Sequence, residues 1–154
     1  FGNISVQSSP NTFYITGSAT GQFANLGTHH YAKVLSYSFV QNPLTCVGLT
    51  KASAESLTHA AVYEVVHEAK AVVHIHCFWL WEKLLNNYPT TSSEIEYGTP
   101  EMAEAVQALA KTLRTNDEKI IVLGGHREGI LAFGRDLEEA INQIIKIYNR
   151  YQND

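Results

Sequence analysis

Cysteine is scarce in this sequence. Only Cys46 and Cys77 occur among 154 residues, too few for the disulfide framework that holds many small secreted domains together, so a reducing, cytoplasmic compartment is expected. Long apolar runs are absent as well, since the most hydrophobic stretch, residues 71–85, is interrupted by two histidines, a glutamate and a lysine. No segment reaches the length of about 20 apolar residues that a membrane span needs.

Positive charge is also sparse. The chain has 11 Lys and Arg residues against 15 Asp and Glu, which gives a formal net charge of −4. The basic residues are scattered, so we expect neither a nucleic-acid surface nor a polybasic membrane anchor. The composition, with 45% hydrophobic and 17% charged residues, is ordinary for a globular protein. A chain of this length is expected to fold as one domain with its own core.

The hydrophobic pattern alternates between short strands and longer helices. Clusters of β-branched and aromatic residues predict strands at 4–6, 13–16, 33–40, 44–49, 71–76, 119–123 and 129–133. Apolar residues at helical spacing predict helices over 54–68, 78–85, 100–113 and 137–148. Thr99 and Pro100 suit the N-cap and the first position of the third helix. No repeat or linker interrupts this pattern, which predicts a single α/β domain.

Two histidines stand in the fifth predicted strand. Alternate side chains of a strand share a face, so His74 and His76 should point the same way while Val73 and Ile75 point the other way. Two imidazoles so placed can meet one metal ion. Taken alone the pattern is weak, because two satisfied core or surface histidines would have the same spacing.

A third histidine follows a predicted buried strand and two glycines. Gly124 and Gly125 permit a tight turn that could present His126 to a cavity. Three protein ligands with an open fourth position are typical of a catalytic zinc ion. In isolation, however, an ordinary loop histidine is the simpler interpretation of His126.

An acidic residue opens the first predicted helix. A carboxylate in a first helical turn is favoured by the helix dipole, so Glu55 could serve the helix alone, or act as an acid/base beside a metal. His59 lies four residues later on the same side. It could be a fourth ligand, although a core histidine hydrogen-bonded to the backbone is the favoured interpretation.

Taken together, these motifs resemble the class II aldolase/adducin family. Each is unspecific, but the set occurs in the family's order and covers almost the whole chain. The motifs are Gly2-Asn3-Ile4-Ser5-Val6, Ile15-Thr16-Gly17-Ser18, Ala52-Ser53-Ala54-Glu55 with His59, Ala71-Val72-Val73-His74-Ile75-His76, Tyr97-Gly98-Thr99-Pro100-Glu101, Gly125-His126 and Phe133-Gly134.

The resemblance implies a fold, an assembly and a metal centre. It implies one α/β domain over residues 1–154, a three-layer α/β/α arrangement around a central, largely antiparallel sheet. Members are usually rotationally symmetric tetramers with active sites at subunit boundaries. The resemblance further implies that His74, His76 and His126 hold a divalent metal, Zn²⁺ first, and that Glu55 transfers the proton.

The resemblance also implies where a phosphorylated substrate would bind. The matching positions are Asn3, Ser18 with the backbone of Ala19, and Ser53 with the backbone of Ala54. Hydroxyls and backbone N–H groups can cradle a phosphate dianion without a basic patch, so the acidic composition is compatible with an anionic substrate.

Several positions depart from the family pattern. Members usually begin with one or two helices before the Gly-Asn motif, whereas this sequence opens at Phe1, so that segment is expected to be lacking. Ala54 replaces a second serine, and Arg127 stands where glycine is typical, either adding a guanidinium for an anion or crowding the pocket. Tyrosines often complete such sites across a subunit boundary, and the candidates here are Tyr88, Tyr148 and Tyr151.

Three functions are compatible with these features. The leading hypothesis is a zinc-dependent class II aldolase-type lyase that acts on a sugar phosphate or small hydroxy-ketone by stabilising an enediolate. The alternatives are another metal-dependent activity of the family, such as a ketose-phosphate dehydratase or pentose-phosphate epimerase, and a non-catalytic adducin-like interaction domain. Retention of all three histidines and of Glu55 argues against the last.

Overall fold

The computed structural model describes residues 1–41 and 44–152. The strands of this part are β1 (Gly2–Ser9), β2 (Thr12–Thr16), β3 (Tyr31–Tyr37), β4 (Leu44–Gly48), β5 (Ala71–His76), β6 (Ile120–Val122) and β7 (Gly129–Gly134). The α-helices are α1 (Ser56–Val65), α2 (Phe78–Leu84), α3 (Pro100–Leu113) and α4 (Leu137–Tyr151), and two short 3-10 turns, η1 (Thr20–Gln22) and η2 (Thr28–His30), join β2 to β3. None of the helices described is long and apolar enough to cross a bilayer.

The strands form one sheet in the order β4-β3-β2-β1-β5-β7-β6, and each neighbouring pair is antiparallel. This confirms the expected antiparallel sheet. Strand β1 leaves its hairpin with β2 to pair with β5, which lies far along the chain. In that register Asn3 is opposite His74, so the Gly-Asn motif meets the first histidine of the predicted metal centre. Gly2 makes this approach possible, because a Cβ there would lie 2.1 Å from the His74 carbonyl oxygen.

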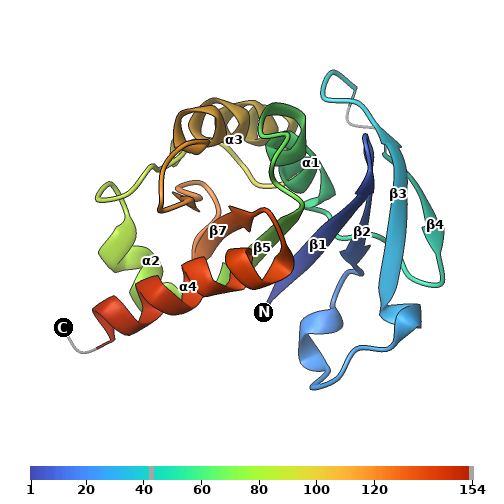
Figure 1. Ribbon diagram of the computed structural model, residues 1–154, viewed down its shortest axis with the longest axis horizontal. Helices are drawn as coiled ribbons and strands as arrows, with labels where there is room; N and C mark the ends of the chain where they lie inside the picture. Colours follow the sequence, from blue (N-terminus) through green and yellow to red (C-terminus); the bar gives the residue numbers. More distant parts are fainter. Residues whose placement is uncertain (42–43, 153–154) are drawn as a thin grey trace.

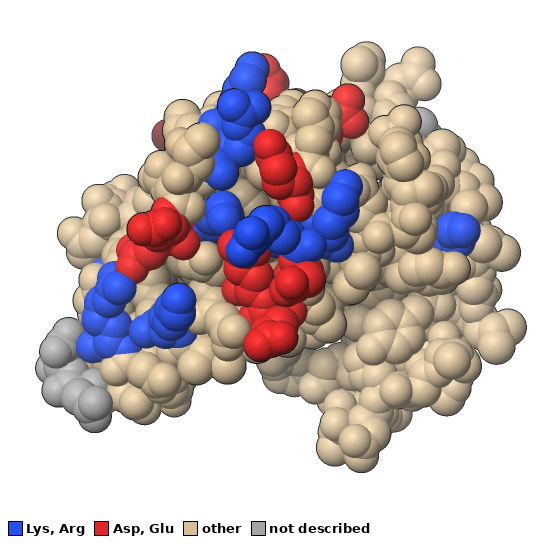
Figure 2. Space-filling model, viewed as in Figure 1, with Lys and Arg blue, Asp and Glu red and all other residues tan. Residues whose placement is uncertain are grey.

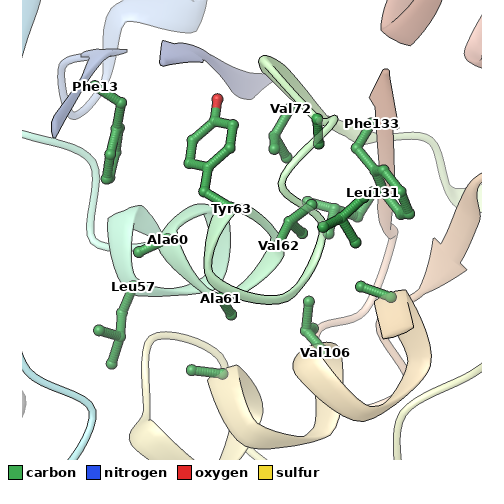
Figure 3. Packing of buried hydrophobic residues seen from close by; sticks show 14 of the residues in the cluster. Phe13, Leu57, Ala60, Ala61, Val62, Tyr63, Val72, Val106, Leu131 and Phe133 are labelled. Carbon is green, nitrogen blue, oxygen red and sulfur yellow. The ribbon is translucent and has the colours of Figure 1, made fainter. Parts of the chain in front are cut away.

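Helices cover both faces of the sheet around β5 and β7. Helices α1 and α3 pack on one face, and α2 and α4 lie on the other (Figure 1). The strands alternate accordingly: Leu131 and Phe133 join the α1/α3 core, whereas Ile130 and Ala132 join the α2/α4 core. Figure 3 shows the first of these cores, in which Val106 of α3 and Leu131 of β7 lie near Val62 of α1. The three-layer α/β/α arrangement is therefore confirmed.

One half of the sheet has helices on a single face. A row of aligned residues crosses β1 to β4 on the other face, from Val6 to Tyr14, Lys33 and Val47. Tyr14 is 47% exposed and Val47 is 58% exposed. The ammonium of Lys33 lies 5.4 Å from the centre of the Tyr14 ring. Apart from Lys33, this row of the sheet face is consequently apolar, and it is open to solvent in a single chain.

The ends of the elements follow their local chemistry. Thr99 caps α3 by accepting a hydrogen bond from the Met102 N–H at 3.2 Å, with Pro100 in the first turn, as the sequence predicts. Strand β5 has the predicted bounds. Helix α1 is shorter than the predicted 54–68 at both ends: it ends at Val65, and residues 53–55 form a separate turn before it. That turn has a role in the site.

Candidate metal centre

Four of the side chains singled out in the sequence gather at one point. Glu55 precedes α1, His74 and His76 belong to β5, and His126 lies in the turn after β6. One ligand atom from each residue can be chosen so that all four lie within 4.8 Å of one another. Residues far apart in the sequence thus form one compact donor set.

Strand β5 supplies two of the histidines on one face. The ring centres of His74 and His76 are 4.8 Å apart, while Val73 points into the core beneath α4 on the opposite face. This is the arrangement that strand alternation predicts. His74 is 1% exposed, and His76 lies nearer the surface.

The third histidine is placed by two glycines. A Cβ at Gly124 would lie 2.1 Å from the Thr91 carbonyl oxygen, and one at Gly125 would lie 1.8 Å from that of Ile95. Only glycine permits so close an approach of the turn to residues 91–95. The result is that the His126 ring centre lies 5.0 Å from that of His74 and 4.7 Å from that of His76.

Glu55 is held by the turn that precedes α1. Both the N–H and the hydroxyl of Ser56 donate to the Ser53 carbonyl, at 3.1 and 2.7 Å, so Glu55 occupies the N-cap position. Its side chain is buried and bridges two histidines. Oε2 lies 2.7 Å from His74 Nδ1, and Oε1 lies 2.8 Å from His126 Nδ1.

The electrostatics favour an ionised Glu55 and a neutral His76. Burial raises the pKa of Glu55, but the His126 and His74 imidazoles beside its two oxygens outweigh burial and leave the pKa well below its usual range. Burial, together with the neighbouring His74 and His126, lowers the pKa of His76 to about 4. A neutral imidazole keeps the nitrogen lone pair that binds a metal.

The donor set fits a divalent transition metal. His74 Nε2 is buried without a hydrogen-bond partner among the described residues, and so are Glu55 Oε1 and His126 Nδ1. Glu55 Oε1 and His126 Nδ1 lie 2.8 Å apart, but they are not aligned for a hydrogen bond. Each unsatisfied buried polar atom costs about 1–3 kcal/mol, a cost that a bound cation would remove. Imidazole nitrogens with a carboxylate are the ligands that zinc and its neighbours prefer.

His59 lies outside this donor set. It is fully buried, and its ring nitrogens contact side chains rather than the backbone: Nε2 is 2.5 Å from Asn3 Oδ1, and Nδ1 is 2.7 Å from Ser5 Oγ. The favoured interpretation of a core histidine is correct, but the expected backbone partner is not. Spacing within α1 could not reveal partners that come from β1.

The two turns expected to bind phosphate lie side by side. An isolated bridge joins Gly17 to Ala52, and Ser18 Oγ donates to the Ala52 carbonyl at 3.2 Å. Ala19 is exposed in the left-handed conformation (φ 61°), and Ala54 is exposed directly before Glu55. The fifth predicted residue, Asn3, turns its side chain towards Glu55, with Nδ2 2.7 Å from Oε2.

A tyrosine that sequence reasoning missed stacks on the cluster. The Tyr97 ring lies 4.5 Å from the His126 ring at an interplanar angle of 26°, and Tyr97 is 55% exposed. Its only signal in the sequence is its place in the Tyr-Gly-Thr-Pro motif.

The three tyrosines named from the sequence lie elsewhere in this chain. Tyr88 accepts a hydrogen bond from Arg150 at 2.7 Å, Tyr148 packs on Trp79, and Tyr151 packs on Tyr88. None of them contacts the histidines within the described part of the chain. Arg127 is exposed, and its guanidinium carbon lies 4.5 Å from the centre of the Phe78 ring.

A large cavity lies away from the histidines. It has a volume of about 880 Å³ and lies where α3 ends and α4 begins, at the other end of β5 and β7. Figure 2 shows Lys, Arg, Asp and Glu side chains crowded on this face. Lys119 and Arg135 both pair with Glu139 there. Because these charges neutralise one another, the candidate site is assigned to the buried donor set and not to this cavity.

Comparisons with known proteins give a family for this sequence and structures with a similar fold. A family model described as the class II aldolase and adducin N-terminal domain matches residues 1–152. No curated protein matches the chain at a significant level.

Several solved structures share the fold at low sequence identity. L-fuculose-1-phosphate aldolase from Thermus thermophilus is 23% identical, with a TM-score of 0.62 over 100% of this chain and 86% of its own. A sugar-phosphate aldolase from Thermotoga maritima is 16% identical, with a TM-score of 0.68 over 96% and 81%. YgbL from Klebsiella pneumoniae, for which aldolase, epimerase and decarboxylase are named as alternatives, is 20% identical, with a TM-score of 0.70 over 96% and 74%.

Proposed function

The chain belongs to the class II aldolase and adducin family, and on that premise we propose that it is a zinc-dependent aldehyde-lyase. The substrate class is a sugar phosphate or a small hydroxy-ketone. The observation that carries the proposal is the Glu55 carboxylate, buried within 2.8 Å of both His74 and His126. A non-catalytic domain has no need to retain buried, unsatisfied donors of this kind.

The three histidines have the role of ligands. We propose that His74, His76 and His126 hold one divalent cation, Zn²⁺ in the first instance, through neutral imidazole nitrogens. When bound, such a cation supplies Lewis acidity that stabilises negative charge developing on the carbonyl and hydroxyl oxygens of the substrate.

Glu55 has the role of the proton-transfer group. In the direction of bond formation, its carboxylate takes a hydrogen from the carbon next to the substrate carbonyl. In the direction of cleavage it returns that hydrogen to the same carbon. The lowered pKa of Glu55 keeps the carboxylate in the form that accepts a proton, and its buried position keeps competing water away.

The anionic end of the substrate is assigned to the two adjoining turns. We propose that Ser18 with the Ala19 N–H, and Ser53 with the Ala54 N–H, bind a phosphate group, with a side-chain N–H of Asn3 beside them. The turns are bridged to one another and lead directly to Glu55. Neutral donors of this kind suit a dianion.

We also propose that the domain acts as a homo-oligomer, a tetramer, in the cytoplasm. The apolar row on the uncovered sheet face, which includes Tyr14 and Val47, supports association, since patches of this kind mark interfaces. Cys46 and Cys77 are both free thiols, which agrees with a reducing compartment.

An epimerase or dehydratase is the second candidate, and one similar structure is named with an epimerase among its alternatives. Aldol bond formation, dehydration and epimerisation next to a carbonyl can each begin with abstraction of a carbon-bound hydrogen, but they differ in the bond that then forms or breaks.

The test separates that shared step from the rest of the reaction. Zinc-loaded protein is incubated with dihydroxyacetone phosphate in D₂O, and loss of one hydroxymethyl hydrogen is followed by NMR. Exchange, together with release of dihydroxyacetone phosphate from a ketose 1-phosphate, is the expected result. Exchange with dihydroxyacetone phosphate but no cleavage across a ketose panel would favour the second candidate. Absence of both reactions would contradict an enzymatic role.

A further inference from the structure

A line of buried polar side chains leads away from Glu55 beneath α1. Asn3 Nδ2 lies 2.7 Å from Glu55 Oε2, and Asn3 Oδ1 lies 2.5 Å from His59 Nε2. His59 Nδ1 lies 2.7 Å from Ser5 Oγ, which lies 2.7 Å from the Tyr63 hydroxyl. These four residues are 8%, 0%, 1% and 3% exposed in the order Asn3, His59, Ser5 and Tyr63.

Two periodicities bring the side chains together. Asn3 and Ser5 are alternate residues of β1 and share the face under α1. His59 and Tyr63 are four residues apart on α1, so they lie one above the other on the helix face that meets β1. Figure 3 shows Tyr63 with its hydroxyl directed away from α1, towards the layer of the sheet.

We propose that Asn3, His59, Ser5 and Tyr63 form a positioning chain whose hydrogen bonds all point towards Glu55, fix its Oε2 atom and leave Oε1 to receive the substrate proton. The catalytic part of this inference rests on the proposed role of Glu55. The direction of the hydrogen bonds in the positioning chain does not depend on that role.

The direction of every hydrogen bond follows from the chemistry of the groups. An ionised carboxylate only accepts, so Asn3 must direct its amide N–H₂ at Glu55 and its Oδ1 at His59. An amide oxygen only accepts as well, so His59 carries its hydrogen on Nε2. In a neutral imidazole Nδ1 is then an acceptor, which makes Ser5 the donor to His59 and Tyr63 the donor to Ser5.

The buried surroundings agree with this arrangement. Burial, with a further contribution from His74, lowers the pKa of His59 to about 3, so the ring is neutral. Burial also raises the pKa of Tyr63 above its usual range, so its hydroxyl keeps its hydrogen. In a medium of low polarity, successive hydrogen bonds of one direction strengthen one another.

The positioning chain orients Glu55 and does not conduct protons. A proton moving from Tyr63 to Glu55 would have to pass through the Asn3 amide, which neither gains nor loses a proton at ordinary pH. The consequence is an asymmetry between the two carboxylate oxygens. Each oxygen lies beside one histidine, Oε2 beside His74 and Oε1 beside His126. Only Oε2 also accepts a hydrogen bond from Asn3, whereas Oε1 is buried without a hydrogen-bond partner among the described residues.

Asn3 therefore has limited capacity for a substrate. Its oxygen and one of its two N–H groups belong to the positioning chain, and Nδ2 also lies 3.3 Å from His74 Nδ1, so at most one N–H remains for an anion. Asn3 acts chiefly as a positioning residue, and the phosphate is bound mainly by the other two turns.

The tautomer of His59 can be read without metal or substrate. In protein labelled with ¹⁵N-histidine and free of metal, we expect the His59 resonances of an Nε2–H tautomer, assigned by their loss in His59→Gln, with no titration between about pH 5 and 8. A Nδ1–H tautomer, or a charged ring in this range, would overturn the proposed direction. This outcome is independent of whether the protein is an aldolase.

A matched pair of variants tests the effect on Glu55. Ser5→Ala interrupts the chain, whereas Thr58→Val removes a buried α1 hydroxyl that has no hydrogen-bond partner among the described residues. With zinc bound, Ser5→Ala is expected to slow deuterium exchange into dihydroxyacetone phosphate by about 10- to 100-fold, as removal of outer-shell partners typically does. Thr58→Val should keep the parent rate.

Rescue separates positioning from general destabilisation. Ser5→Thr restores a hydroxyl at the same place and should recover most of the exchange rate, although its extra methyl group lowers the melting temperature. Equal losses in Ser5→Ala and Thr58→Val, or an unchanged rate in Ser5→Ala, would overturn the positioning role. If the parent catalyses no exchange, the proposed function fails, and the tautomer of His59 still decides the arrangement of the chain.

Discussion

At the scale of single residues, the central feature is a carboxylate shared between histidines. Glu55 contacts His74 through one oxygen and His126 through the other. Sequence spacing allowed Glu55 two interpretations, helix-start chemistry and acid/base chemistry. The structure joins them, because the N-cap position of α1 is also the position that faces β5.

The role of Glu55 is tested by an isosteric change. Glu55→Gln keeps the size of the side chain and the hydrogen bond from Asn3, but it removes the group that accepts a proton. With zinc bound, we expect loss of deuterium exchange into dihydroxyacetone phosphate by about 10²–10⁴-fold, the usual contribution of a general base. Bound zinc, measured by elemental analysis, should persist. Glu138→Gln, at an exposed position of α4, serves as the control. A Glu55→Gln protein with full activity would exclude the proposed base.

At the scale of elements, turns place the functional groups and strands hold them in register. The Gly124-Gly125 turn presses against residues 91–95 so tightly that any added Cβ would overlap a carbonyl oxygen. His126 is the next residue. The position of His126, one of the proposed ligands, thus depends on the absence of a Cβ at Gly124 and Gly125.

A single methyl group should therefore disturb the metal centre. In Gly125→Ala the new Cβ would lie 1.8 Å from the Ile95 carbonyl oxygen, so the turn must move and carry His126 with it. We expect zinc affinity, measured by competition with a chelating dye, to fall by about 10-fold or more. Gly27→Ala is the control, since its Cβ would meet only the ring of exposed His29. Equal affinities in both variants would show that the turn does not position the ligand.

The carboxyl group of Glu139, at the start of α4, predicts a dependence of stability on pH. Asp136 accepts a hydrogen bond from the Glu139 N–H at 2.7 Å, and Glu139 accepts one from the Arg135 N–H at 2.8 Å. Burial raises the pKa of Glu139, but its bonds to Arg135 and Lys119 outweigh burial and lower the pKa from 4.5 to about 2. A carboxyl with a lowered pKa in the folded state stabilises the protein above its ordinary pKa, and that stability is lost as the pH falls.

Glu139→Gln should accordingly unfold more easily than the parent at pH 7, by about 1 kcal/mol. The difference should shrink as the pH falls from about 4.5 towards 2. Urea unfolding of both proteins across this range measures it. A difference that stays constant with pH would mean that packing, not charge, accounts for the effect.

Local rules predicted the elements, and long-range pairing placed the site. The start of α3 at Thr99 and Pro100, and the shared face of His74 and His76, follow from capping preferences and strand alternation. The contact between Asn3 and Glu55 depends on the pairing of β1 with β5, which no local preference specifies. Tyr97 was missed for the same reason, since it reaches His126 only through the fold.

At the scale of the whole molecule, the helices do not cover the two faces of the sheet equally. Helices cover both faces around the metal centre, while the β2–β4 half leaves one apolar face open in a single chain. The proposed tetramer would be expected to cover apolar surface of this kind.

The mass in solution tests this proposal. Sedimentation equilibrium is expected to give a species of about four times the 17.1 kDa chain mass. The double variant Tyr14→Glu/Val47→Glu should shift that mass towards the single chain, because it places charge on the open face. Asn149→Glu, at an exposed position of α4, should not. A parent that sediments as a single chain at all concentrations would exclude the tetramer.

The most direct test of the central claim is the metal content of the protein. Protein purified without chelators and analysed for elements beside the His74→Ala/His76→Ala variant should contain close to one zinc per chain, and the variant should contain none. A parent protein that holds no metal, even after incubation with zinc, would contradict the proposed metal centre and return the interaction domain as the leading function.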